Sequence, residues 1–317
     1  MIQGIRLMTL LLCTLAGLPA PGAQPAPVRL TNIINSYPSP SPDGTRVVFQ
    51  SNRTGRYEIY TMAVDGSSVA QLTDRPGDNV TAAWSPDGER IAFAANEGEN
   101  SDVYIMHADG SDIVRLTEHP GDDSHPHWSA DGSRIMFNSP RTTPDLSVGW
   151  LDQWHEVFSM KPDGSDKRQH TDNRTVCTYP SFSPDGTRIV YRKITSTPGF
   201  SWDLSSRPRN SEVFVADVDG SNELNLSNSA AFDGWPVWSP DGTRVAFASN
   251  RAGPAYVGHI WIVNADGTGL QQVTHGPWSY VQPAWAGDGV RIFAYQHQET
   301  PDFEFGDVVI VDIRADR

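Results

Sequence analysis

The feature that most constrains this chain is a short motif that returns six times along its 317 residues. The clearest copy is Trp84-Ser85-Pro86-Asp87-Gly88, followed by an apolar run at 91–94. The aspartates of the six copies, each followed by glycine, are Asp43, Asp87, Asp131, Asp185, Asp241 and Asp288. A second Asp-Gly pair follows each of the first five copies, and its aspartates are Asp65, Asp109, Asp163, Asp219 and Asp266. The copies lie 44 to 56 residues apart, and a tandem repeat of this period indicates a propeller, a solenoid or an array.

Each repeat has room for four short strands, which we call a to d in chain order. Asp-Gly between alternating apolar residues is a strong hairpin signal, because glycine accepts the positive φ of a tight turn. In the second repeat we expect strands at 82–85, 90–95, 102–107 and 113–117, and no repeat has the pattern of a helix. Six such repeats predict an all-β fold, a six-bladed β-propeller of four-stranded antiparallel blades.

The two ends of the repeat array predict how the ring closes. The sixth repeat stops after strand c and has no second Asp-Gly pair. Ahead of the first repeat, Val28-Arg29-Leu30-Thr31 has the same letters as Val114-Arg115-Leu116-Thr117 in strand d of the second. We therefore expect this N-terminal stretch to be the outer strand of the last blade, so that no blade keeps an unpaired edge. The predicted propeller spans 28–317.

The first 23 residues are predicted to be a secretory signal peptide. Arg6 precedes an apolar run at 7–18, and small residues follow up to Ala23, where we expect cleavage. The run is too short to span a bilayer, since a transmembrane helix needs roughly 20 apolar residues. Cys13 follows the bulky Leu12, which argues against a lipid anchor. Residues 24–27 then form a short linker, and the protein is expected to be periplasmic or secreted, with no membrane span.

Composition excludes several classes of function. The chain has 38 acidic and 24 basic residues, a formal net charge of −14, which disfavours nucleic acid because phosphate binding needs a basic surface. Cys177 is the only cysteine outside the predicted signal, so neither an internal disulfide nor a thiolate zinc cluster can form, and we expect it to be packed and inert. No Gly-x-Ser-x-Gly elbow of a serine hydrolase is present.

The ordered set of motifs resembles the TolB-type propeller repeat. It comprises Pro-x-Trp-Ser-Pro-Asp-Gly, Ser-Asn-Arg at 51–53 and 249–251, an acid that opens strand c, the second Asp-Gly pair and a final Leu-Thr. The resemblance covers 28–317 and implies a six-bladed periplasmic propeller that docks envelope proteins. TolB itself has an α/β domain ahead of its propeller, whereas here only 24–27 separate the predicted signal from the first strand. We therefore expect a TolB-like propeller without that domain.

One face of the propeller is expected to carry the variable loops. Because each strand crosses the blade once, the d–a and b–c connections share one face, which we call the loop face. Its b–c loops are longest in the third and fourth repeats, at 141–155 and 195–211. Long loops on a rigid scaffold are where binding residues concentrate. Aromatic residues gather in the loops of this face, at Trp150, Trp154, Phe200, Trp202, Phe232, Trp235, Trp278 and Tyr280.

The residue that opens strand a should ring the central channel. In the six repeats this residue is Tyr37, Thr81, His125, Tyr179, Trp235 and Gln282. Such diversity favours shaped recognition, although packing alone also permits it. Exposed aromatic rings suit the recognition of a peptide, a protein or a glycan, while the alternative is that they pack the loops onto the blades. The predicted binding residues are Tyr37, His125, Trp150, Trp154, Tyr179, Phe200, Trp202, Trp235, Trp278 and Tyr280.

Four histidines offer a second interpretation of the same face. His119, His125, His127 and His155 lie at or before the start of inner strands or at the end of an insertion, where a metal-dependent lyase would place ligands or a base. Their spacing is weakly specific, so we assign no catalytic residue, no metal ligand and no cofactor; a divalent cation in the channel is the alternative. The favoured function is a monomeric module that binds an envelope protein or peptide. The alternative is a glycan-binding propeller or a metal-assisted polysaccharide lyase.

Overall fold

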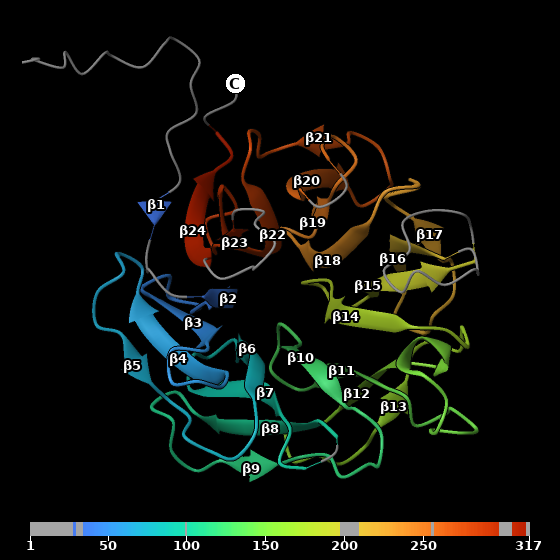
Figure 1. Ribbon diagram of the computed structural model, residues 1–317. Coiled ribbons are helices and arrows are strands. Elements are labelled where there is room, and N and C mark those ends of the chain that lie inside the picture. Colours follow the sequence, from blue (N-terminus) through green and yellow to red (C-terminus); the bar gives the residue numbers. More distant parts are fainter. Residues whose placement is uncertain are drawn as a thin grey trace, which may run out of the picture.

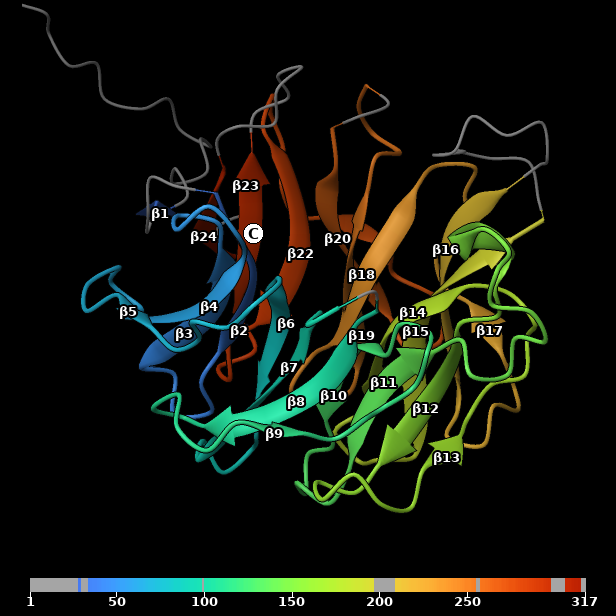
Figure 2. The same ribbon diagram turned by 60° about the horizontal axis from the view of Figure 1, so that its bottom comes forward.

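The computed structural model describes the backbone of 28–29 and residues 34–98, 100–196, 209–254, 257–297 and 306–314. These residues form six four-stranded antiparallel sheets arranged around one axis (Figure 1). Figure 2 shows the same ring tilted, with the outer strands at its rim. The predicted all-β six-bladed propeller is confirmed.

Each blade runs outward from the axis in chain order. The innermost strands, a, are β2 (Asn35–Pro40), β6 (Asn79–Trp84), β10 (Ser124–Trp128), β14 (Cys177–Phe182), β18 (Asp233–Trp238) and β22 (Ser279–Trp285). The second strands, b, are β3 (Arg46–Ser51), β7 (Arg90–Ala95), β11 (Ile135–Ser139), β15 (Arg188–Thr195), β19 (Arg244–Ser249) and β23 (Arg291–His297). The third strands, c, are β4 (Glu58–Ala63), β8 (Asp102–His107), β12 (Glu156–Met160), β16 (Asn210–Asp217), β20 (His259–Asn264) and β24 (Gly306–Asp312). The outer strands, d, are β5 (Ala70–Gln71), β9 (Val114–Arg115), β13 (Arg168–Gln169), β17 (Leu224–Asn225), β21 (Gln271–Gln272) and β1 (Val28–Arg29).

The predicted strands of the second blade match the structure at its centre and differ at its edges. The bounds of β7 and β8 are those predicted, but β6 begins at Asn79 rather than at residue 82, because a bulge lets pairing with β7 continue past Thr81. The outer strand β9 pairs over two residues only. The expectation of no helix is corrected by one short 3₁₀ helix, η1 (Trp150–Asp152), within the first long b–c loop.

The ring closes through the N-terminal strand. β1 pairs antiparallel with β24, with Val28 opposite Ile310 and Arg29 opposite Val309. This strand precedes the first blade in sequence and completes the sixth, as the repeated letters predicted. The outer edge of β24 is therefore paired, which removes a site where another chain could add a strand.

The Ser-Pro-Asp-Gly motif is a self-contained turn. Asp43 Oδ1 accepts hydrogen bonds from Ser41 Oγ at 2.6 Å and from the Thr45 amide at 3.0 Å, and Gly44 takes the positive φ of 70°. The corresponding atoms of Asp241 make the same two bonds in the fifth blade. Because all of these partners lie within a few residues, the turn needs no tertiary support.

Neighbouring blades are joined by apolar contacts and by arginine–tryptophan stacking. The motif tryptophan of one blade is buried against strand residues of the previous one; Trp84, for example, packs with Val48 and Ile59. The guanidinium of Arg46 lies 5.9 Å from the centre of the Trp84 ring, and Arg90 makes the same contact with Trp128 at 4.9 Å. The repeated motif thus builds the interface between blades.

Candidate functional site

The centre of the molecule is ringed by six residues, one from each inner strand. The sequence predicted that they open these strands, but they lie one to three positions inside them, because strand pairing continues before each bulge. These residues, which we call the channel mouth, are Tyr37, Thr81, His125, Tyr179, Trp235 and Gln282. All six have a positive φ, between 51° and 55°, and each lies where the pairing of strands a and b shifts register. A β-bulge therefore re-aims one side chain per blade toward the axis. The predicted ring is confirmed as an arrangement of residues.

The sequence after each bulge residue fits this geometry. Five of the six are followed by proline, and Thr81 is followed by Ala82. Proline donates no backbone hydrogen bond and is tolerated in strands mainly at edges and bulges. Positive φ is rare for residues other than glycine and is unfavourable for a β-branched residue such as Thr81. In compensation, the Thr81 amide donates to Gln50 Oε1 of the previous blade at 2.9 Å.

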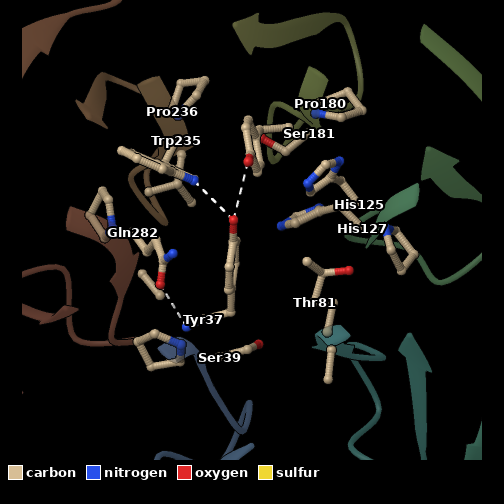
Figure 3. A pocket seen from close by; sticks show the side chains of 18 residues that line it. Tyr37, Ser39, Thr81, His125, His127, Pro180, Ser181, Trp235, Pro236 and Gln282 are labelled. Carbon is tan, nitrogen blue, oxygen red and sulfur yellow. Dashed lines mark hydrogen bonds between the residues drawn. The ribbon is translucent and has the colours of Figure 1, made fainter. Parts of the chain in front are cut away.

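Tyr37 reaches across the channel and joins its own blade to three others (Figure 3). Its hydroxyl lies 3.1 Å from the hydroxyl of Tyr179 and accepts a hydrogen bond from Trp235 Nε1 at 3.2 Å. Its amide donates to Gln282 Oε1 at 2.8 Å. Burial, followed by the neighbouring Tyr179, raises the pKa of Tyr37 well above its usual value, so it stays a neutral phenol. These contacts make the channel mouth a connected polar and aromatic cluster.

His125 is held as a neutral ring beside that cluster. Its Nδ1 lies 2.7 Å from Asn138 Oδ1, and its ring centre is 3.9 Å from that of Tyr179. Since Asn138 Nδ2 donates to Ser124 Oγ at 3.0 Å, we assign the amide oxygen to the histidine side and the histidine proton to Nδ1. Burial lowers the pKa of His125 to about 3. The imidazole is therefore uncharged at neutral pH, with Nε2 as its acceptor atom.

A small cavity lies within the ring. Its volume is about 140 Å³, and its walls are the inner-strand residues of all six blades, including the five prolines that follow the bulges. Pockets for drug-sized ligands usually measure about 300–1,000 Å³. The cavity therefore accommodates a side chain or the tip of a segment, and any larger ligand must extend over the loop face.

The structure brings together four of the ten predicted binding residues. Tyr37, His125, Tyr179 and Trp235 are linked by the contacts described above, and the Tyr179 and Trp235 ring centres are 5.8 Å apart. Phe200 and Trp202 lie outside the described residues. The remaining four occupy separate places around the loop face.

Two of these four belong to the first long b–c loop. Trp150 is 40% exposed and lies 4.6 Å, between ring centres, from His155. Trp154 is half-buried beneath the Arg174 guanidinium, which is 5.5 Å from its ring centre. The other two pack between the fifth and sixth blades: Trp278 is half-buried there, and Tyr280 is 5% exposed and accepts a hydrogen bond from Gln296. Trp150 is thus the most exposed of the described candidates.

Sequence reasoning missed one residue next to the channel mouth. Arg192, in β15, is 7% exposed, and its guanidinium carbon lies 5.1 Å from the centre of the Tyr179 ring. Arg192 pairs with Thr178, the residue that precedes the bulge of the fourth blade. The residue of strand b at the same position in the other five blades is uncharged: Gln50, Ala94, Asn138, Ala248 and Tyr295. An alignment of strand b across the six repeats would have identified Arg192 as the only charged residue at this position.

The described residues do not form an evident metal centre. Within the described ranges, no three histidine, cysteine, aspartate or glutamate side chains converge as metal ligands would. Cys177 is fully buried, and burial raises the pKa of its thiol. In the same part of the chain, no helix has the length and apolarity needed to cross a bilayer.

Comparisons with known proteins agree with this architecture. The family described as the Tricorn protease N-terminal beta propeller domain matches residues 64–198. The Tol-Pal system protein TolB of Anaeromyxobacter dehalogenans is 31% identical over 135 residues, which are 41% of this chain and 26% of that protein. The chain therefore spans about a quarter of that relative's length.

Solved structures share the fold at low sequence identity. TolB from Acinetobacter baumannii superposes with a TM-score of 0.63 and 20% identity, covering 80% of this chain and 57% of that one. An oligogalacturonate lyase in complex with manganese superposes with a TM-score of 0.60 and 13% identity, covering 91% and 78% of the two chains. Both structural similarities are similarities of the propeller fold.

Proposed function

We propose that this six-bladed β-propeller, which is similar to TolB over part of its length, is a recognition module that binds a peptide or protein segment at the channel mouth. The observation that carries the proposal is the asymmetry of that ring. Six equivalent positions present two tyrosines, a histidine, a tryptophan, a threonine and a glutamine around one cavity. A ring that served only to hold six equivalent blades together has no need of six such different side chains.

The chemistry of the ring suits a segment of protein. Tyrosine and tryptophan provide large contact areas with few rotatable bonds, together with a polar atom at the tip, and they dominate binding energy in protein interfaces. The cavity of about 140 Å³ takes one anchoring side chain, while the loops around it supply the remaining contacts. Trp150, with 40% of its surface exposed, is the described loop residue best placed to do so.

We further propose that the partner belongs to the bacterial cell envelope and that the protein acts in the periplasm or outside the cell. The support is the similarity to a Tol-Pal system protein and the predicted signal peptide at 1–23. We propose that the protein is a monomer and that the propeller at 28–317 is its binding unit.

A photo-crosslinking experiment tests the binding face. A photoreactive phenylalanine analogue replaces Thr81 at the channel mouth in one protein and the 51%-exposed Val114 of the outer strand β9 in another. We expect the Thr81 probe to crosslink a defined envelope protein, the Val114 probe not to do so, and a peptide from the crosslinked segment to compete. Trp235→Ala should weaken binding of that peptide roughly 30-fold or more, as loss of a tryptophan anchor does, and Val114→Ser should not.

Two results would contradict this proposal. Crosslinking only from β9, with binding indifferent to Trp235→Ala, would move the interface to the outer rim of the ring. Release of unsaturated products from polygalacturonate, abolished by a chelator and by His125→Ala, would instead establish the lyase function.

A further inference from the structure

The cluster beside the channel mouth contains a buried positive charge with no negative partner among the described residues. The Arg192 guanidinium forms no hydrogen bond and no ion pair with any described residue, and its Nε is fully enclosed. The ionisable side chains that influence it are Tyr179, Tyr37 and Cys177, and none of them is a carboxylate. An arginine side chain stays protonated, and therefore charged, even when it is buried. A buried charge without a compensating partner is strongly unfavourable.

The blade architecture does not require this charge. The other blades place glutamine, alanine, asparagine, alanine or tyrosine at the same position. The longer polar side chains at this position reach the channel mouth. Gln50 Oε1 accepts a hydrogen bond from the Thr81 amide, and Asn138 Oδ1 contacts His125. Arg192 likewise extends to the mouth, where it lies over the Tyr179 ring.

In the part of the chain that the structure describes, the surroundings of Arg192 supply further donors and no acid. Thr178, opposite Arg192 in the sheet, has a buried hydroxyl without a partner, and so does Ser181 in the cavity wall. Two histidines lie within the electrostatic influence of Arg192. Burial, reinforced by Arg192, lowers the pKa of His125 to about 3 and that of His155 to about 4. The region therefore has unsatisfied donors, one permanent positive charge and two neutral imidazoles.

We propose that Arg192, together with the free hydroxyls of Thr178 and Ser181, binds a carboxylate of the peptide segment that enters the channel mouth. The guanidinium fork matches a carboxylate in a bidentate arrangement, and the apolar cavity receives the attached side chain. One guanidinium beside neutral histidines balances one negative charge, which fits a carboxylate better than a doubly charged phosphate. This inference rests on the proposed function, because it names the group of the peptide that the site recognises.

The source of the carboxylate is either a chain terminus or an acidic side chain. Three probes separate these sources: N-acetylphenylalanine carries only a terminal carboxylate, N-acetylglutamate α-amide carries only a side-chain carboxylate, and N-acetylglutamine amide is the neutral isostere of the second. Galacturonic acid forms a fourth arm, for the sugar acid. The readout is the NMR signal of the Trp235 indole N–H, assigned with Trp235→Phe, in the protein that begins at residue 24.

We expect at least one of the two carboxylate probes to shift this signal saturably, while the neutral isostere leaves it unchanged. Arg192→Gln should weaken carboxylate binding about 10- to 100-fold, the range expected for loss of a charged hydrogen bond. Arg168→Gln, at an exposed arginine on the outer strand β13, should bind as the unaltered protein does. Since Arg192→Gln removes an unpaired buried charge, its melting temperature should equal or exceed that of the unaltered protein.

The contrary outcomes are distinct. Three results would overturn the carboxylate site. The neutral isostere could bind as well as the carboxylate probes, Arg192→Gln could bind the carboxylate as tightly as the unaltered protein, or Arg192→Gln could lose substantial stability. Saturable binding of galacturonic acid without either peptide probe would overturn the peptide assignment. If the crosslinking experiment fails while carboxylate binding depends on Arg192, the proposed partner is wrong and the carboxylate site stands. If a partner binds and is indifferent to Arg192→Gln, only this inference fails.

Discussion

Buried histidines make the stability of the channel region depend on pH. His155 is fully buried against Trp150 and forms no hydrogen bond of good geometry, although the Trp150 carbonyl partly opposes the fall in its pKa. Burial is the main cause that lowers this pKa to about 4. Burial also lowers the pKa values of His125, His127, His170 and His259. The folded protein therefore takes up fewer protons than the unfolded chain in mildly acidic solution.

The first prediction follows from His155 alone. Its contribution to stability is complete above the unfolded pKa of about 6.5 and is lost as the pH falls toward its folded pKa of about 4. Between pH 7.5 and pH 5 this loss is about 2 kcal/mol, from one proton bound over roughly 1.5 pH units. Urea unfolding across that range should show a shallower decline for His155→Phe, which keeps an aromatic ring against Trp150. His107→Gln, at an exposed side chain, should follow the unaltered protein; equal slopes for all three would contradict the assignment.

At the level of elements, a hydroxyl in the segment that follows strand d fastens five of the blades. It belongs to Thr73, Thr117, Thr171, Ser227 and Thr274 in the first to fifth blades. Thr73 Oγ1 accepts the Ile59 amide at 2.8 Å and donates to the buried Glu58 carboxylate at 2.5 Å. Thr117 repeats both contacts in the second blade, with the Val103 amide and Asp102. The acid that opens strand c and the threonine of the final Leu-Thr are therefore hydrogen-bonded to each other, which explains why the repeat contains both.

The second prediction concerns this contact. Thr73→Val keeps the shape of the side chain but leaves the Ile59 amide without its acceptor and removes one donor to Glu58. Leaving a buried polar group unsatisfied costs about 1–3 kcal/mol, so urea denaturation should show a loss of that size, with partial recovery in Thr73→Ser. Ser67→Ala, in the exposed Asp65 turn, should cost about 0.5 kcal/mol or less. A loss no larger in Thr73→Val than in Ser67→Ala would show that the contact is dispensable.

At the scale of the whole molecule, closure depends on a strand of two residues. β1 covers the outer edge of β24 through the pairs Val28–Ile310 and Arg29–Val309. The first and sixth blades are also held by a shared apolar cluster that includes Phe49 and Phe293. The ring should therefore survive loss of β1 with reduced stability and an exposed edge.

The third prediction compares two truncated proteins. A chain that begins at residue 34 lacks β1, whereas a chain that begins at residue 24 keeps it. We expect the shorter chain to lose about 1–3 kcal/mol in urea unfolding, since each backbone hydrogen bond contributes about 1 kcal/mol net. It should also associate in sedimentation experiments, because unpaired strand edges recruit other chains. Equal stability of both chains, with no association of the shorter one, would mean that closure does not depend on β1.

The sequence by itself determined the repeat, the four strands of each blade, the hairpins and the strand that closes the ring. These features follow from contacts within a few residues, such as those of Asp43 with Ser41 and Thr45, or from repetition of the same letters. Local chemistry of this kind can be recognised without knowing the fold.

The contacts that the side chains at the axis make with one another could be read only from the folded ring. The Tyr37 amide bonds to Gln282, 245 positions away, and bulges with positive φ aim six side chains inward. Likewise, the burial of Arg192 without an acid from any described residue depends on strands that converge from different blades. Such contacts arise from closure of the ring, so aromatic residues that are alike in sequence separate in space: Trp235 joins the channel, whereas Trp278 packs between blades.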